Sequence, residues 1–252
     1  MVHALLSTHV PAWRRLARGV VDLLYPDLCP WCQRVLAADE DPLACPDCAA
    51  SVLRIIAPYC ATCGLPVDSG EGVPACARCL EDPPAYDHLR GVVVYGGRVA
   101  AAIANLKYQR RLTSGYALAG VLYRAIDLGI NWTTYDAIIP VPLFPARFRQ
   151  RWFNQSLFLA AALPNAERLP LRPTWLRRVR DTVPQASLSA VERVANVKGA
   201  FAVAPGAPLA GKRLLLVDDV ATTGSTLHEC ARVCKKAGAA AVDAVVVARA
   251  KG

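Results

Sequence analysis

Eight of the ten cysteines in this 252-residue chain stand in four Cys-x2-Cys pairs, and these pairs constrain the fold more than any other feature. Twelve residues separate the first pair from the second and the third from the fourth, and the whole unit recurs with a shift of 31 residues. A Cys-x2-Cys turn places two thiolates on one side of a tight knuckle, and two knuckles complete a tetrahedral shell around Zn²⁺. We therefore predict two zinc sites, with the ligands Cys29, Cys32, Cys45, Cys48, Cys60, Cys63, Cys76 and Cys79.

Both zinc sites are expected to be structural. Each repeat is only ~20 residues long, too short to be held together by hydrophobic burial, so the metal would supply the folding energy. Four thiolates also leave no open coordination position for catalysis. Disulfides would need an oxidising compartment, and an iron–sulfur cluster of the ferredoxin kind usually needs three cysteines in one run. Sequential pairing of the knuckles is the shorter closure, and interleaved pairing stays open.

Cys230 and Cys234 stand apart from the repeat, four residues from each other on an expected helix. Two thiols with no nearby histidine or carboxylate pair make a poor metal site. We interpret both as small buried hydrophobic residues.

Charge divides the chain into two parts. Residues 29–82 carry a net charge of −5 and residues 83–252 a net charge of +13, which makes the larger part suited to polyanions. We divide the chain into an amphipathic helix over 1–28, a double zinc unit over 29–85 and a larger domain over 86–252. We expect Cys63→Ser to damage the zinc unit and to leave ligand binding by the larger domain intact.

No membrane span is expected, because apolar runs such as Ala244–Ala248 fall far short of the roughly 18 residues that a span needs. The first 28 residues lack a continuous apolar core with a small-residue cleavage site, which argues against a signal peptide. We therefore expect a cytoplasmic protein.

A candidate phosphate site lies near the C-terminus. Leu214–Val217 is a short apolar run of the kind found in a strand buried on both faces of a parallel sheet. Asp218 and Asp219 follow it, then a turn of small residues, then a helix that begins near Ser225. The positive end of that helix offers backbone N–H groups to an anion, and the two carboxylates accept hydrogen bonds from vicinal hydroxyls. An acidic strand end with an ordinary helix cap is the simpler alternative, but the complete unit favours a ribose 5-phosphate site.

The stretch Leu215–Thr226 resembles the signature with which type I phosphoribosyltransferases bind 5-phosphoribosyl-1-pyrophosphate (PRPP). From about Leu24 onwards, the chain resembles the ComF family. Besides the cysteine repeat, the resemblance includes Leu106–Tyr108, Asp136–Leu143, Arg151–Gln155, Thr182–Gln185, Arg193, Asn196–Val197 and Ala200–Phe201. Trp152 departs from the family pattern, which has glycine before Phe-Asn-Gln, and its bulk is expected to alter the loop or to close off space.

The resemblance implies an α/β fold, a type I phosphoribosyltransferase domain with a Rossmann-like parallel sheet preceded by a small double zinc ribbon. It assigns catalysis to Asp218 and Asp219, and a loop for the pyrophosphate near Pro142, where a cis peptide is one option. The residues that it implies for PRPP binding are Val220, Ala221, Thr222, Thr223, Gly224, Ser225, Thr226, Lys107, Pro142 and Leu143. A mobile loop over 177–198 would close on the site and contains Arg177, Arg178, Arg180, Gln185 and Arg193.

Two functions follow from the resemblance. The first is Mg²⁺-dependent transfer of the phosphoribosyl group to an unknown acceptor. Thr222 stands where purine-salvage enzymes have a carboxylate near the base, which argues against 6-oxopurine salvage. The second is non-catalytic PRPP binding in the uptake or handling of single-stranded DNA, with a DNA-uptake helicase or another competence protein as partner.

Overall fold

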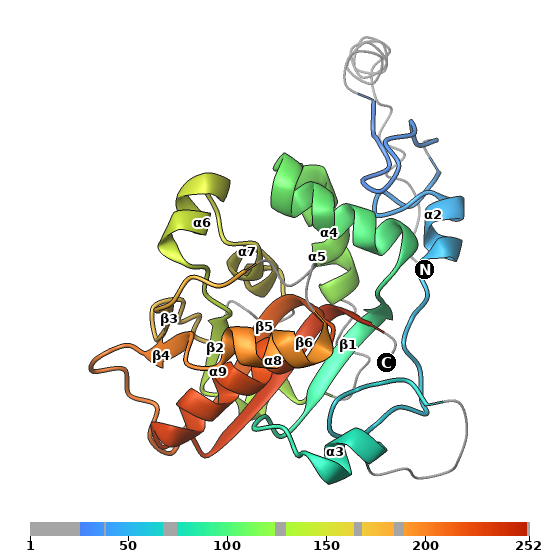
Figure 1. The fold of residues 1–252 in the computed structure, drawn as a ribbon. Helices are drawn as coiled ribbons and strands as arrows, with labels where there is room; N and C mark the ends of the chain where they lie inside the picture. The colour runs from blue at the N-terminus through green and yellow to red at the C-terminus, as the bar shows by residue number, and fades with distance from the viewer. Residues whose placement is uncertain are drawn as a thin grey trace, which may run out of the picture.

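A computed structural model describes residues 26–37, 39–67, 75–123, 130–163, 168–183 and 189–250 (Figure 1). The amphipathic helix expected over residues 1–28 falls outside this part of the chain, apart from its last three residues. Within the described ranges, no helix is both long enough and apolar enough to cross a membrane.

A four-stranded parallel sheet forms the centre of the molecule, in the order β1 (Leu89–Val94), β6 (Ala241–Arg249), β5 (Arg213–Ala221) and β2 (Ala137–Pro140). Every residue of β6 and nearly every residue of β5 is buried, as expected for inner strands that are covered on both faces. The apolar run predicted as a strand is thus the core of β5, and the α/β fold class is confirmed.

Helices cover both faces of the sheet. α4 (Gly97–Gln109), α5 (Leu112–Tyr123) and α7 (Gln155–Ala161) lie on one side, and α9 (Ser225–Lys236) lies on the other with α8 (Ala190–Val197) beside it (Figure 1). Side chains of a strand point alternately to its two faces, so neighbouring residues of β5 enter different cores. Cys230 and Cys234 of α9 are fully buried against the sheet, and their predicted role as buried hydrophobic residues is confirmed.

Shorter elements complete the larger domain. α6 (Pro145–Arg151) follows β2, and the 3-10 helix η2 (Trp132–Thr134) precedes β2. β3 (Leu176–Arg178) and β4 (Phe201–Val203) form a two-stranded antiparallel sheet, and α8 belongs to the chain segment between them.

The two cysteine repeats fold alike at their ends. α2 (Pro46–Ser51) begins directly after Cys45, and α3 (Ala77–Glu81) begins directly after Cys76. Their packing differs, because the cysteines of the first repeat form a small separate cluster, whereas those of the second belong to the core between the sheet and α9. Figure 1 shows α2 beside α4 and α3 near the opposite end of β1.

Candidate functional site

Each cysteine repeat gathers its four sulfur atoms into one site. The sulfurs of each group all lie within 4.8 Å of one another, and the groups are Cys29, Cys32, Cys45 and Cys48, and Cys60, Cys63, Cys76 and Cys79. The Sγ–Sγ distance is 3.8 Å for Cys32 and Cys45 and also for Cys63 and Cys76. A tetrahedral zinc with Zn–S bonds of about 2.3 Å sets its sulfurs about 3.8 Å apart. Both sites therefore fit a structural zinc, and the knuckles pair sequentially.

Backbone donors prepare these sulfurs for a metal. The N–H of Cys45 donates to Cys29 Sγ at 3.4 Å, and the N–H of Cys76 donates to Cys60 Sγ at 3.2 Å. Burial by itself raises the pKa of the Cys29 and Cys60 thiols, but donation from nearby N–H groups outweighs it and lowers both pKa values to about 6. Such thiols are readily deprotonated, as metal binding requires.

The predicted phosphate loop joins β5 to α9. Gly224 caps α9 with a φ of 80°, a left-handed conformation that glycine adopts without strain. Thr223 Oγ1 accepts a hydrogen bond from the N–H of Ser225 at 3.3 Å. The N–H groups of Thr222, Thr223 and Gly224 donate to no backbone carbonyl among the described residues, so this end of α9 can present N–H donors to an anion.

The acid pair lies at the carboxyl end of β5. Asp218 and Asp219 are both buried, and Asp218 Oδ1 accepts from Ser156 Oγ at 2.8 Å and from the N–H of Asp219 at 2.9 Å. Lys107 reaches the pair from α4 and forms an ion pair with Asp219 Oδ2. The structure thus brings Lys107 to the carboxylates, and it adds Ser156, which was not predicted as a site residue.

Burial also sets the protonation of this cluster. It raises the pKa of Asp218 to about 7, the charge of Asp219 adds to this effect, and Lys107 opposes it. For Lys107, burial favours the neutral amine, but the charges of Asp219 and Asp218 outweigh burial and raise its pKa. The lysine therefore stays charged beside the acids.

Pro142 and Leu143 follow β2 at the same edge of the sheet as the acid pair. Pro140 of β2 pairs with Val217 of β5, and the N–H of Val141 donates to Val217 O at 2.9 Å. Within the described ranges the cis peptide is Ala57–Pro58, so the bond before Pro142 is trans and the cis option is not realised.

Arginines gather beside the acid pair. Arg147 and Arg151 come from one face of α6, and Arg178 comes from β3. Burial lowers the pKa of both Arg151 and Arg178, each is lowered further by the charge of Arg147, and each is raised by Asp218. Thr182 accepts hydrogen bonds from Arg147 and from Arg178. Arg147 and Arg151 were not predicted as site residues, although their spacing of four on a helix after the Pro142 loop was a usable signal.

The residues expected in a mobile loop lie in different places. Arg177 and Arg178 are part of β3, and Arg193 is part of α8. Arg180 donates to Asn196 O at 2.9 Å and to Lys198 O at 2.8 Å, across the base of the segment between β3 and β4. Gln185 falls outside the described residues.

Trp152 ends α6 with a φ of 68°. A non-glycine residue in this left-handed conformation costs about 1–2 kcal/mol, which gives a physical reason for the glycine of the family pattern. The side chain is 75% exposed, so it does not fill the space near the acid pair.

A cavity of about 460 Å³ opens beside the phosphate loop. Thr223, Gly224 and Ser225 form one part of its wall, and α8 and α9 form others. The second cysteine repeat and the segment that follows it complete the wall through Arg78, Cys79 and Tyr86. The second ribbon therefore borders the candidate site directly.

Comparison with known proteins agrees with this architecture. The double zinc ribbon domain matches residues 20–80, and the phosphoribosyl transferase domain matches residues 177–252. The DNA utilization protein YhgH of Salmonella typhi is 35% identical over 224 residues, which cover 88% of this chain and 96% of the relative. Competence protein F of Haemophilus influenzae is 32% identical over 197 residues, or 77% and 85% of the two chains.

A more distant relative is the competence protein ComFC of Bacillus subtilis, 25% identical over 208 residues that cover 80% of this chain and 81% of the relative. Because the similarity runs through both the zinc ribbons and the phosphoribosyltransferase domain, at nearly full length in the first relative, the chain belongs to the ComF family.

Proposed function

We propose that the protein binds PRPP with Mg²⁺ at the carboxyl edge of its sheet and transfers the phosphoribosyl group to an acceptor. The observation that carries the proposal is the continuity of the site. A buried acid pair at the end of β5 is followed at once by a loop with free N–H donors, and cationic side chains stand beside the acids. A ribose 5-phosphate with a pyrophosphate on C1 needs these three kinds of partner side by side.

Each part of PRPP has its own partners in this proposal. Asp218 and Asp219 accept from the ribose hydroxyls, and the N–H groups between residues 222 and 226 hold the 5-phosphate. The pyrophosphate lies towards Pro142 and Leu143, within reach of cationic groups. Those groups are Lys107, Arg147, Arg151 and Arg178, and the forked donors of arginine match phosphate oxygens.

Mg²⁺ prefers oxygen ligands, and the carboxylates of Asp218 and Asp219 offer them directly or through water. When bound with PRPP, the metal screens the charge of the leaving pyrophosphate. The C1–O bond breaks with its electron pair on pyrophosphate, the lone pair of the acceptor bonds to C1, and the acceptor loses a proton to the departing pyrophosphate or to water. The protein contributes positioning and electrostatic stabilisation. Thr222 supplies no carboxylate near the acceptor, so we expect no transfer to 6-oxopurines.

A second candidate function is the handling of single-stranded DNA. Its support is the names of the relatives, a DNA utilization protein and two competence proteins, together with the net charge of +13 on residues 83–252. Basic surfaces bind nucleic-acid phosphates with little sequence preference. A DNA-uptake helicase or another competence protein would be the partner. We place either function in the cytoplasm, where the cysteine thiols stay reduced for zinc.

Calorimetry with PRPP and Mg²⁺ tests the binding proposal. Asp218→Asn and Asp219→Asn should each weaken binding by about 1–3 kcal/mol, because a charged hydrogen bond to a ribose hydroxyl is lost. Asp136→Asn is the matched control, since this exposed aspartate accepts from the N–H of Arg213 at the opposite end of β5. Unchanged affinity in both site variants would remove the proposal.

Two further assays separate the candidate functions. Release of pyrophosphate from PRPP across a panel of acceptors tests transfer. A labelled oligonucleotide titrated at two salt concentrations, with and without PRPP, tests DNA binding, which should weaken steeply with salt. Alanine at Arg177, Arg178 and Arg180 should flatten this salt dependence if DNA crosses the site. Turnover without DNA binding at low salt would favour the transferase alone.

A further inference from the structure

Arg249, at the end of β6, is buried in an unusual setting. Only 1% of the residue is exposed, yet no described carboxylate pairs with it. Its donors reach backbone carbonyls from two distant parts of the chain. Burying a charge without compensation is costly, so the surroundings of this guanidinium must supply negative potential.

One end of the guanidinium reaches the second zinc ribbon. Arg249 Nε donates to Cys63 O at 3.1 Å, across 186 residues of sequence. Four thiolates around Zn²⁺ leave a net double negative charge, and this charge lies beside Arg249 when the second site holds zinc. Burial raises the pKa of Tyr86, the charge of Cys63 raises it further, and the charge of Arg249 opposes this rise.

The other end of the guanidinium reaches the phosphate loop. Arg249 Nη1 donates to Ala221 O at 3.0 Å and also to Thr222 O. In a trans peptide the C=O and the following N–H point in opposite directions. Carbonyls held towards Arg249 therefore turn the N–H groups of Thr222 and Thr223 to the other side of the loop. These are two of the N–H groups that have no backbone acceptor among the described residues.

A second contact reinforces this connection. A Cβ atom placed on Gly224 would lie 2.9 Å from the hydroxyl oxygen of Tyr86, so the phosphate loop packs closely against the residue that follows the second ribbon. The ribbon is itself held to β1, because the N–H of Leu89 donates to Thr62 O at 2.7 Å. The loop, Tyr86 and the second knuckle thus form one packed unit.

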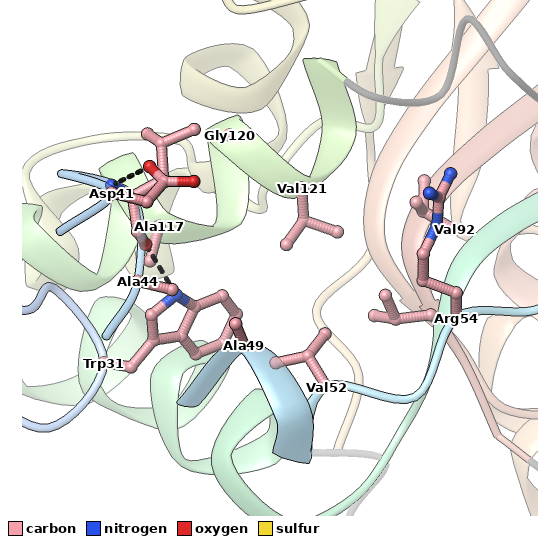
Figure 2. Close-up of a pocket in the computed structure, with 12 residues that line it drawn as sticks. Trp31, Asp41, Ala44, Ala49, Val52, Arg54, Val92, Ala117, Gly120 and Val121 are labelled. Carbon is pink, nitrogen blue, oxygen red and sulfur yellow. Dashed lines mark hydrogen bonds between the residues drawn. The ribbon is translucent and has the colours of Figure 1, made fainter. Parts of the chain in front are cut away.

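Among the described residues, no hydrogen bond like that from Arg249 to Cys63 links the cysteines of the first ribbon to the phosphate loop, although the segment after α2 pairs with β1 through Arg54 and Val93. The first ribbon meets the larger domain around a pocket of about 110 Å³, where Leu43 packs against Gly120 of α5 and Val52 faces Val121 (Figure 2). Trp31 Nε1 donates to Leu43 O at 3.0 Å and keeps the ribbon's own loop in place. This contact lies on the face of the sheet opposite to α9.

We propose that Arg249 is a positioning residue that makes the second zinc site part of the phosphate-binding machinery. Zinc in the second ribbon, and not zinc in the first, sets the affinity for PRPP. The inference deepens the proposed function and rests on it for the identity of the ligand. It also changes the expectation for Cys63→Ser, which now weakens ligand binding by the larger domain.

The test compares Cys63→Ser with Cys32→Ser, its positional equivalent in the first ribbon, in the full-length protein. Each variant should lose one zinc per chain by elemental analysis. We expect the Kd for PRPP with Mg²⁺ to rise at least tenfold for Cys63→Ser and less than twofold for Cys32→Ser. Equal values in the two variants would overturn the proposal.

Two variants of Arg249 keep the test decisive if Cys63→Ser fails to fold. Arg249→Met removes the donors at similar volume and should keep both zincs while raising the Kd at least tenfold. Arg249→Lys keeps the charge, but a compact ammonium cannot reach Cys63 O and the carbonyls of Ala221 and Thr222 together, so its Kd should fall between those of Arg249→Met and the unaltered protein. An Arg249→Met variant that binds PRPP normally would refute the positioning role.

A ligand-free measurement separates this inference from the proposed function. Hydrogen exchange of the backbone amides in residues 218–226 should speed up in Cys63→Ser and Arg249→Met and stay unchanged in Cys32→Ser. If neither the unaltered protein nor any variant binds PRPP, the proposed function fails. Exchange that still follows this pattern would then support the connection between the second ribbon and the phosphate loop. Unchanged exchange in every variant refutes the connection itself.

Discussion

The two zinc ribbons have the same cysteine spacing, the same sequential pairing and the same short helix after the third cysteine, yet they differ in what surrounds them. Cys60, Cys63 and Cys79 lie in the core that contains β5 and α9, whereas the cysteines of the first ribbon form a cluster of their own. The repeated cysteine spacing thus indicates that both ribbons bind the same kind of metal. The contacts around each ribbon give the two copies different roles.

Two equivalent backbone positions, Gln33 and Gly64, show how the packing of the two ribbons differs. Gln33 and Gly64 each follow the second cysteine of their ribbon and adopt φ values of 65° and 63°. Gln33 has room for its side chain, but a Cβ atom on Gly64 would lie 2.5 Å from Leu89 O. Glycine is required in the second ribbon by close packing on β1 as well as by backbone conformation.

The largest loss of stability and of PRPP affinity is expected from Gly64→Ala in the second ribbon. The added methyl group meets the Leu89 carbonyl and forces the second knuckle away from β1, at a cost of about 3 kcal/mol in the free energy of unfolding. Zinc should fall to one per chain, and PRPP affinity should drop at least tenfold. Gly206→Ala is the control, because Gly206 has a φ of 77° and nothing within 4 Å of its Cβ position. Equal unfolding midpoints in the two variants would remove the distinction between the ribbons.

A chelator added at increasing concentration should remove the two zinc ions one after the other. The first zinc should leave earlier, because its cysteines form a small cluster outside the main core. Alkylation of the released thiols, mapped by mass spectrometry, identifies the ribbon that opens. PRPP binding should survive the first step and fail at the second. Release of both zincs in a single step would contradict this order.

The pH dependence of PRPP binding should reveal the acid pair. The raised pKa of Asp218, about 7, means that this carboxyl is mostly protonated at pH 6 and ionised at pH 8. The ionised carboxylate accepts a ribose hydroxyl more strongly than the protonated acid does, so affinity should rise by up to about tenfold between these values. Asp218→Asn should remove this part of the rise, and Cys32→Ser should retain it. A profile that is the same with and without Asp218 would assign the titration to the ligand.

The smallest effect is expected from Gln33→Gly in the first ribbon. Relief of the positive φ should exceed the entropic cost of glycine by less than about 1 kcal/mol. The first zinc should therefore leave slightly more slowly under chelation, with no change in the Kd for PRPP. A change in that Kd would show that the first ribbon also reaches the ligand site.

Several features were predictable from the sequence because their parts are neighbours along the chain. The Cys-x2-Cys spacing determines the knuckles, and Leu214–Val217 followed by two aspartates and a glycine turn determines β5, the acid pair and the start of α9. Lys107 was predicted as a PRPP-binding residue from the family resemblance alone. The sequence predicted neither its ion pair with Asp219 nor the hydrogen bond from Ser156 to Asp218, because both depend on how α4 and α7 pack on the sheet.

The sequence by itself determined the metal chemistry and the phosphate loop, since each requires particular residue types at short, regular spacing. Only the tertiary structure decided which knuckles pair, which ribbon enters the core and which arginines meet the acids. Arg249 is the sharpest case, because a single arginine at the end of a buried strand carries no local signal. Its role arises only when parallel pairing sets β6 beside β5 and packing brings the second ribbon against the same side chain.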